Sequence, residues 1–174
     1  MTISVSTVNS TYELSLAYQQ VCETALATTV GGVPDLSYIY PVEPVMDCCD
    51  ALIVFMAALT EETTSPISPP ASTGHRASYG RLNLVTLTAW ILRCAPPVNE
   101  NGSIELTEIE RVAQEVQQDG WAMWNGIYKA INDSTFLDIC TAVHFDRSAP
   151  IKEQGGCLGW SATIRAELGG IPNE

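Results

Sequence analysis

The feature that most constrains this fold is a long segment, Leu82–Cys94, in which side chains alternate between two faces. Every second residue shares a face, and the residues of one such set, or parity, are aliphatic, namely Val85, Leu87, Ala89 and Ile91. The residues of the other parity mix threonine with larger groups, namely Leu84, Thr86, Thr88, Trp90 and Leu92. Alternation over this length predicts a β-strand with one face in a hydrophobic core. The second face suits partial cover by a helix or by another subunit.

Three further segments are predicted as strands. Ala51–Leu59 is apolar at both parities, which indicates a strand covered on both faces, with a short buried helix as the alternative. Leu137–Phe145 alternates between apolar and mixed positions, and Trp160–Leu168 has a clean period of two. Residues 146–156, between the last two strands, are predicted as a long hairpin loop. The chain therefore offers about four strands.

Two segments carry the spacing of amphipathic helices. The first is predicted to begin with a capping box at Ser10 and to end at Gly31. The second is predicted to begin with a capping box at Thr107. Its apolar stripe consists of Ile109, Val112, Ala113, Val116, Met123, Trp124, Ile127 and Ile131. Gly120 costs about 1 kcal/mol relative to alanine, which predicts a kink or a close contact beneath the sheet.

The connections complete the predicted architecture. Residues 31–50 carry three prolines, which predict an extended, irregular connection. Residues 60–80 are rich in serine, threonine and proline and are predicted as a long loop, either solvated or ordered by a partner. The order of elements predicts an α+β fold, with two helices on one face of a mostly antiparallel sheet. One domain spanning residues 1–174 is expected.

The composition is acidic but poor in charge. Eight Lys and Arg residues face 20 Asp and Glu residues, which gives a net charge of −12. Charged residues nevertheless make up only 16% of the chain, against a usual share of about 25%. This balance argues against a nucleic-acid binder that works by neutralising phosphates, because that mode needs a basic face. The apolar share of 46% excludes intrinsic disorder and indicates that apolar surface is buried between chains as well as within one.

The sequence contains no recognisable motif for catalysis, a cofactor or a metal. It has no phosphate-binding glycine loop, no nucleophile elbow and no zinc-protease helix motif. Its six cysteines include no CxxC pair and are predicted to be reduced and mostly buried. We therefore expect no enzyme activity, no cofactor and no metal. The N-terminus lacks the pattern of a signal peptide, and no apolar run is long enough for a membrane span.

The order, length and texture of these segments resemble the tail terminator proteins of long-tailed siphophages, in particular those of phages that infect actinobacteria. The resemblance covers the whole chain and is densest from Leu82 to Leu168. It is carried by the helix Thr11–Thr28, the run Asp47–Val54, the strand Leu87–Pro96, the helix through Asp119–Trp121 and the closing run Gly156–Leu168.

This resemblance implies a structural virion protein. It implies a homo-hexameric ring that caps the tail tube, ends the polymerisation of the tail tube protein and joins the tail to the head-side stopper or connector protein. The protein would lie in the tail-neck region of the virion after assembly in the host cytoplasm. DNA would pass through the lumen without specific binding, and an acidic balance suits such a lumen because it does not hold phosphate.

A ring that closes by head-to-tail contacts needs two different complementary patches on each subunit. Candidate patches are the threonine and tryptophan face of the segment Leu84–Leu92, the Ser/Pro-rich loop and the tip of the last hairpin. The residues predicted to contact another subunit or the tube are Arg76, Tyr79, Arg81, Thr86, Thr88, Trp90, Ile151 and Lys152.

Two alternatives stay open at this point. A head-tail stopper or adaptor ring of the same neck would also be a small acidic ring former, although we expect a stopper to be a strand-rich small barrel. A small soluble enzyme or binding module belongs to a different class. Mass in solution and binding to tail tubes distinguish that class from the ring formers.

Overall fold

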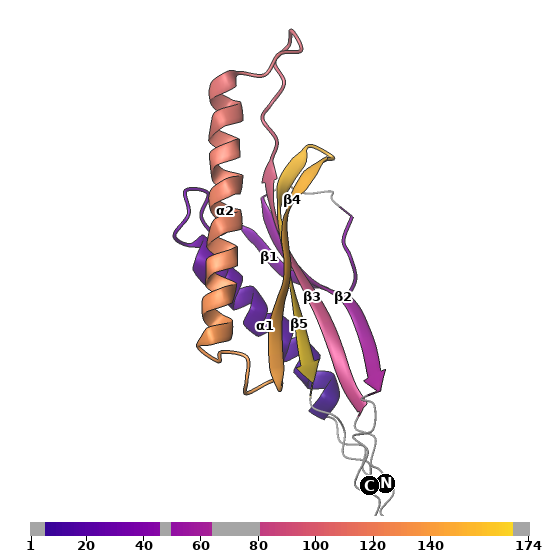
Figure 1. Cartoon of the computed structure of the whole chain (residues 1–174). Coiled ribbons are helices and arrows are strands. Elements are labelled where there is room, and N and C mark those ends of the chain that lie inside the picture. The colour runs from indigo at the N-terminus through magenta and orange to yellow at the C-terminus, as the bar shows by residue number, and fades with distance from the viewer. Residues whose placement is uncertain (1–5, 46–49, 64–80, 169–174) are drawn as a thin grey trace, which may run out of the picture.

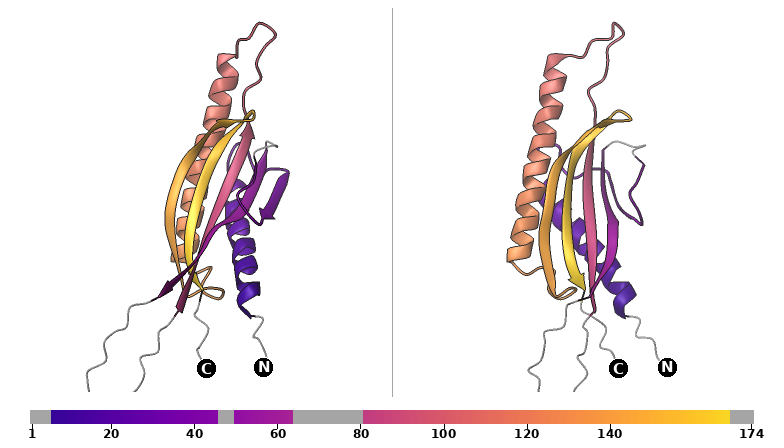
Figure 2. Two further views of the ribbon diagram at one scale, coloured as in Figure 1. Left: turned by 90° about the vertical axis from the view of Figure 1, so that its right-hand side faces the viewer. Right: turned by 45° about the vertical axis from the view of Figure 1, so that its right-hand side comes forward.

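The computed structural model describes residues 6–45, 50–63 and 81–168. The helices are α1 (Ser6–Leu26) and α2 (Leu106–Asn132), and the strands are β1 (Leu36–Tyr40), β2 (Ala51–Thr63), β3 (Arg81–Cys94), β4 (Ala142–Gln154) and β5 (Cys157–Leu168). The strands form one sheet in the order β1-β2-β3-β5-β4, and both helices lie on the same side of it (Figures 1 and 2). Only β1 and β2 pair in parallel. The predicted α+β class is therefore confirmed, with five strands in place of about four.

The additional strand, β1, lies within the segment that is predicted to be irregular. It is framed by Pro34 and Pro41 and pairs with the start of β2, with Leu36 opposite Ala51. β1 is an edge strand, and prolines beside an edge strand leave the hydrogen-bond ladder intact. The prediction of a wholly irregular connection is therefore wrong.

The central strands have the predicted two-faced pattern. The aliphatic face of β3 is fully buried at Val85, Leu87, Ala89 and Ile91. β2 is a strand and not the alternative short helix, and it continues to Thr63. The loop predicted over residues 60–80 therefore begins later than expected, and residues 64–80 lie outside the described part of the chain.

The last two strands form a longer hairpin than the alternation predicts. Residues 137–141 are turn and irregular backbone, whereas most of residues 146–156, for which a loop is predicted, belong to β4. The hairpin turns at Gly155 and Gly156, which have positive φ angles of 62° and 76°. Glycine adopts this left-handed backbone without steric cost. The predicted hairpin loop is therefore wrong, because an edge strand with polar outward positions lacks an apolar signature.

Both helices begin before their predicted starts, and α1 also ends earlier than predicted. α1 includes Ser10 and ends before Gly31, so neither residue bounds it. α2 already includes Thr107, and Glu105 occupies its N-cap position without a side-chain capping hydrogen bond. The predicted capping boxes therefore do not mark the helix starts. The first turns of α2, with the connection before them, project past the end of the sheet (Figure 1).

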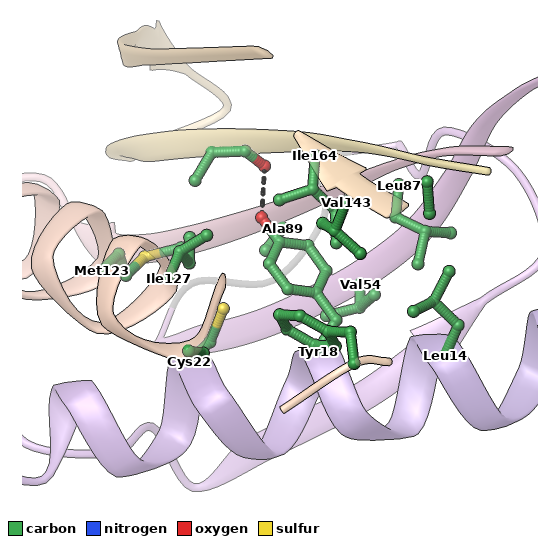
Figure 3. Close-up of a cluster of buried hydrophobic side chains, with 14 of the residues drawn as sticks. Leu14, Tyr18, Cys22, Val54, Leu87, Ala89, Met123, Ile127, Val143 and Ile164 are labelled. Carbon is green, nitrogen blue, oxygen red and sulfur yellow. Dashed lines mark hydrogen bonds between the residues drawn. The ribbon is translucent and has the colours of Figure 1, made fainter. Parts of the chain in front are cut away.

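The main hydrophobic core lies between the helices and the sheet (Figure 3). α1 contributes the fully buried side chains of Leu14, Tyr18, Cys22 and Leu26. The Tyr18 hydroxyl donates a hydrogen bond to the backbone carbonyl oxygen of Ala162 at 3.0 Å, which satisfies the buried phenol. A Cβ atom at Gly120 would lie 2.4 Å from the Cδ2 atom of Trp160. The close contact predicted at Gly120 is therefore present.

The cysteines differ in state. Cys157, at the start of β5, is disulfide-bonded, so the prediction of reduced thiols is wrong at this position. Cys22, Cys94 and Cys140 are free thiols. Burial raises the pKa of Cys140 to about 11. Burial, with a smaller effect of Glu23, also raises the pKa of Cys22, so both thiols stay protonated at neutral pH and lack the reactivity of a thiolate.

Candidate interaction surfaces

Three predicted contact residues on β3 lie on the face of the sheet turned away from the helices. These are Thr86, Thr88 and Trp90, which share one parity opposite to the core face. Figure 2 (left) shows the sheet from this side. Thr88 pairs with Thr163 of β5, and their hydroxyl oxygens are 3.0 Å apart in a buried hydrogen bond. Thr88 is therefore part of the sheet's own packing and offers little to a partner.

A second, smaller apolar cluster lies on this helix-free face. Its buried members are Ala51, Ile53 and Leu92, and the partly buried Tyr38, Trp90 and Ile151 pack against them. Trp90 also meets Phe55 edge to face, with ring centroids 5.0 Å apart. Trp90 and Ile151 are predicted as members of separate patches, on a strand and at a hairpin tip. The sheet brings them together because β3 and β4 both pair with β5.

The other predicted contact residues do not gather around this cluster. Thr86 is half-buried further along β3, and Lys152 is exposed near the end of β4. Arg76 and Tyr79 lie outside the described residues. Arg81 begins β3, but its side chain is outside the described part of the structure.

Basic side chains gather on the helix-free face at the β4 end of the sheet. His144 lies opposite Arg165, and Arg147 lies opposite Thr163, in the pairing of β4 with β5. An Nη2 atom of Arg165 is 3.1 Å from Oδ1 of Asp146. Both side chains of this ion pair are largely in solvent, so it contributes little stability. The helix-free face thus changes from the apolar cluster that includes Trp90 and Ile151 to charged side chains around Arg147 and Arg165.

A stack of three aromatic side chains on α2 is absent from the predicted contact residues. The rings of Trp121 and Trp124 are stacked with centroids 5.3 Å apart, and those of Trp124 and Tyr128 with centroids 5.6 Å apart. Trp121 is 66% exposed and Tyr128 is 53% exposed. Their spacing along the helix is the sequence signal that could have placed them on one row. Trp124 belongs to the predicted core stripe, yet it lies only partly buried within this stack.

An open groove of about 870 Å³ separates parts of α1 and α2. The helices approach each other closely at Gly126, where an added Cβ atom would lie 2.6 Å from the Cβ atom of Ala25. Among the residues that line the groove, only Lys129 and Asp133 carry a charge. The groove therefore offers a surface with little charge and no set of converging catalytic groups.

Arg93, near the end of β3, is buried in an ion-pair network. Its Nε donates a hydrogen bond to Oδ2 of Asp119 at 2.8 Å, its Nη1 donates to Oδ1 of Asp50 at 2.7 Å, and its Nη2 donates to the carbonyl oxygen of Gly32 at 2.6 Å. Burial lowers the pKa of Arg93, but hydrogen bonds and charges from Asp119 and Asp50 outweigh burial and raise it. Thr29 donates a further hydrogen bond to Oδ1 of Asp119 at 2.8 Å. The network joins α2 to the sheet and to the end of α1, which is a structural role.

Comparisons with known proteins assign no family to this chain. No protein-family model matches it, and a search of curated proteins finds no significant match. Within the described residues, no three metal-binding side chains gather in one place. No helix in the described ranges is long and apolar enough to cross a membrane.

Proposed function

We propose that this chain is a structural virion protein, the tail terminator of a long-tailed bacteriophage. Copies of the chain form a ring, hexameric by the resemblance, that caps the tail tube and ends the polymerisation of the tail tube protein. The ring also joins the tail to the head-side stopper or connector protein. In this role the protein works by binding and not by catalysis, in the tail-neck region of a virion assembled in the host cytoplasm.

The observation that carries the proposal is the aromatic surface left uncovered on α2. The stack of Trp121, Trp124 and Tyr128 stands beside a complete hydrophobic core and contributes little to it. Contiguous exposed apolar surface of this kind marks protein–protein contacts, and aromatic residues are enriched in them. The low share of charged residues, 16%, supports a protein whose surface is occupied by neighbours.

Two further properties support the terminator in particular. A net charge of −12 suits a ring through which DNA slides, because acidic side chains repel phosphate. The two long helices over one open sheet favour the terminator over the stopper, for which we expect a strand-rich barrel.

Purified full-length protein, with tail tubes and head connectors of the phage that encodes it, tests the proposal. Light scattering and electron microscopy measure whether the chain forms rings, and co-sedimentation measures whether it binds tubes. We expect rings that bind at one end of each tube. A compact monomer at high concentration that does not co-sediment with tubes refutes the proposal. Binding to head connectors without binding to tubes would instead assign the chain to the stopper.

A further inference from the structure

We propose that two flanks of this chain, at opposite ends of the sheet, are the two halves of one contact between copies. The α2 flank consists of Trp121, Trp124 and Tyr128. The α1–β1 flank consists of Tyr12, Leu16, Leu36 and Tyr40. The α2 flank of one copy packs against the α1–β1 flank of the next copy. This assignment rests on the ring proposed above and names the surfaces that build it.

The α2 flank lies at the β4 end of the sheet. α2 packs mainly on β4 and β5, whereas α1 packs mainly on β1, β2 and β3. The side of α2 that faces α1 is marked by Ala122 and Lys129, which line the groove between the helices. With 3.6 residues per turn, the aromatic row is centred on a different side of the helix. Trp121, at the edge of the row, still lines this groove, whereas Trp124 and Tyr128 are not part of its lining. The row continues toward the helix start through Gln117 and Ala113, so it carries no charged side chain from Ala113 to Tyr128.

The α1–β1 flank lies at the other end of the sheet. One row of α1 consists of Tyr12, Leu16, Gln19 and Glu23. Gln19 Nε2 donates a hydrogen bond to Oγ of Ser37 at 2.7 Å, and the Ser37 hydroxyl donates one to Glu23, so this row faces β1. β1 has five residues and spans about 16 Å, whereas α1 has 21 residues and spans about 31 Å. The strand is too short to cover the row, and Tyr12 stays 58% exposed.

β1 continues this flank onto the sheet. Leu36 and Tyr40 have the parity opposite to that of Ser37, so they lie on the helix-free side of the strand, and both side chains are exposed. The flank therefore passes around the edge of the sheet, from the row on α1 to the outer side of β1. Leu16 of α1 is exposed as well. The charged member of the α1 row, Glu23, is already engaged with Ser37 and Gln19. The flank therefore presents aromatic and aliphatic side chains with little free charge.

A second copy of the chain is the occupant that fits both flanks. Each copy carries a net charge of −12, so two copies repel each other wherever their acidic surfaces meet. They associate most readily through surfaces that lack charge, and aromatic composition with few charges is typical of interface cores. The two flanks differ from one another and lie at opposite ends of the strand order. Contact between them is therefore head-to-tail. A row of copies joined in this way has one unused flank at each of its two ends until the row closes into a ring.

Backbone pairing between the edges of neighbouring sheets is a poor alternative. The edge strand β4 contains Pro150 and has register shifts after Phe145 and after Ile151. The other edge strand, β1, is short and framed by Pro34 and Pro41. Short edges, prolines and bulges all oppose the addition of a further strand. The contact therefore depends on side chains of the two flanks.

Two double variants and one matched control test the assignment. Trp121→Ser with Tyr128→Ser removes the α2 flank, and Tyr12→Ser with Leu16→Ser removes the α1–β1 flank. Val98→Ser is the control, because Val98 is an exposed apolar residue outside both flanks. Sedimentation velocity measures self-association of the full chain at low and high salt, and circular dichroism checks that each variant is folded. We expect each double variant to associate at least about 30-fold more weakly than the wild type, whereas the control is unchanged.

The mixture of the two double variants is the decisive measurement. Each variant keeps the flank that the other lacks, so a 1:1 mixture should form a heterodimer that cannot grow further. Higher salt should strengthen wild-type association, because it screens the repulsion between acidic copies. A mixture that stays monomeric overturns the assignment, as does wild-type association of either double variant.

The remaining outcomes separate this assignment from its rivals. If only the α2 variant loses association, the contact pairs two identical flanks and the head-to-tail assignment is wrong. If both variants associate normally but lose tube binding, the flanks contact the tube and the assignment is also wrong. A monomeric wild type overturns the flank contact by itself, whereas co-sedimentation with tubes decides the proposed function separately.

Discussion

Removing the Asp119 carboxylate should cost much more stability than removing an exposed carboxylate from the same helix. Asp119 is fully buried and accepts hydrogen bonds from Arg93 and Thr29. In Asp119→Ala, the Arg93 guanidinium keeps Asp50 and the carbonyl of Gly32 but loses its buried counter-ion. Removing one partner of a buried ion pair costs about 3–5 kcal/mol, because the other charge loses its buried compensation; Asp50, which remains, is 46% exposed and compensates the guanidinium less well.

Glu115→Ala is the matched control for this measurement. Glu115 lies one turn before Asp119 on α2 and accepts a hydrogen bond from Arg111 at 2.6 Å. Arg111 is half-exposed, and a helical pair of this spacing contributes about 0.3–0.5 kcal/mol. Both substitutions introduce alanine into the same helix, so differences in helix propensity are small between them.

Urea unfolding, followed by tryptophan fluorescence and circular dichroism, measures the difference. With an m value of about 2 kcal/mol per molar urea, Asp119→Ala should lower the midpoint by about 1.5–2.5 M and Glu115→Ala by about 0.2 M. Arg93→Met combined with Asp119→Leu removes both charges and should recover part of the loss. Equal losses for Asp119→Ala and Glu115→Ala would refute the reasoning. So would a combined variant that loses the sum of its two single substitutions.

Three further predictions concern the core and the sheet. Gly120→Ala should lower the free energy of unfolding by about 1–3 kcal/mol despite its better helix propensity, because the new Cβ would lie 2.4 Å from Trp160; an unchanged melting temperature would contradict this. Thr88→Val and Thr163→Val should each lower the free energy of unfolding by about 1–3 kcal/mol, because each leaves a buried hydroxyl without its partner. The double variant should lose less than either single variant. Additive losses in denaturant unfolding would argue against the hydrogen bond. Burial raises the pKa of Cys140 from 9.0 to about 11, so its contribution to stability is fully present below pH 9 and is lost as the pH rises through 11. Cys140→Ser should flatten that part of the stability curve, and an identical curve for the variant would count against burial of the thiol.

The central strands are predictable because the polarity of each side chain matches its burial. In β3 the aliphatic parity is the buried parity, and the clean period of Trp160–Leu168 lies within β5. In the edge strands β1 and β4, polarity does not follow burial in this way. β1 is too short to show a period, and its strand conformation depends on pairing with β2. Asp146 and Arg147 are predicted as loop residues because they are polar, but an edge strand tolerates polar side chains on its open face.

The sequence by itself determined the fold class and the core face of β3 and β5, and it predicted either a kink or a close contact at Gly120. Only the tertiary structure decided which apolar side chains stay at the surface. Trp124 has the spacing of a core residue but stacks between Trp121 and Tyr128, because the sheet covers only part of the circumference of α2. Trp90 and Ile151 meet because β3 and β4 flank the same strand. Spacing along one element tells which side chains share a face, whereas the cover of that face comes from elements far away in the sequence.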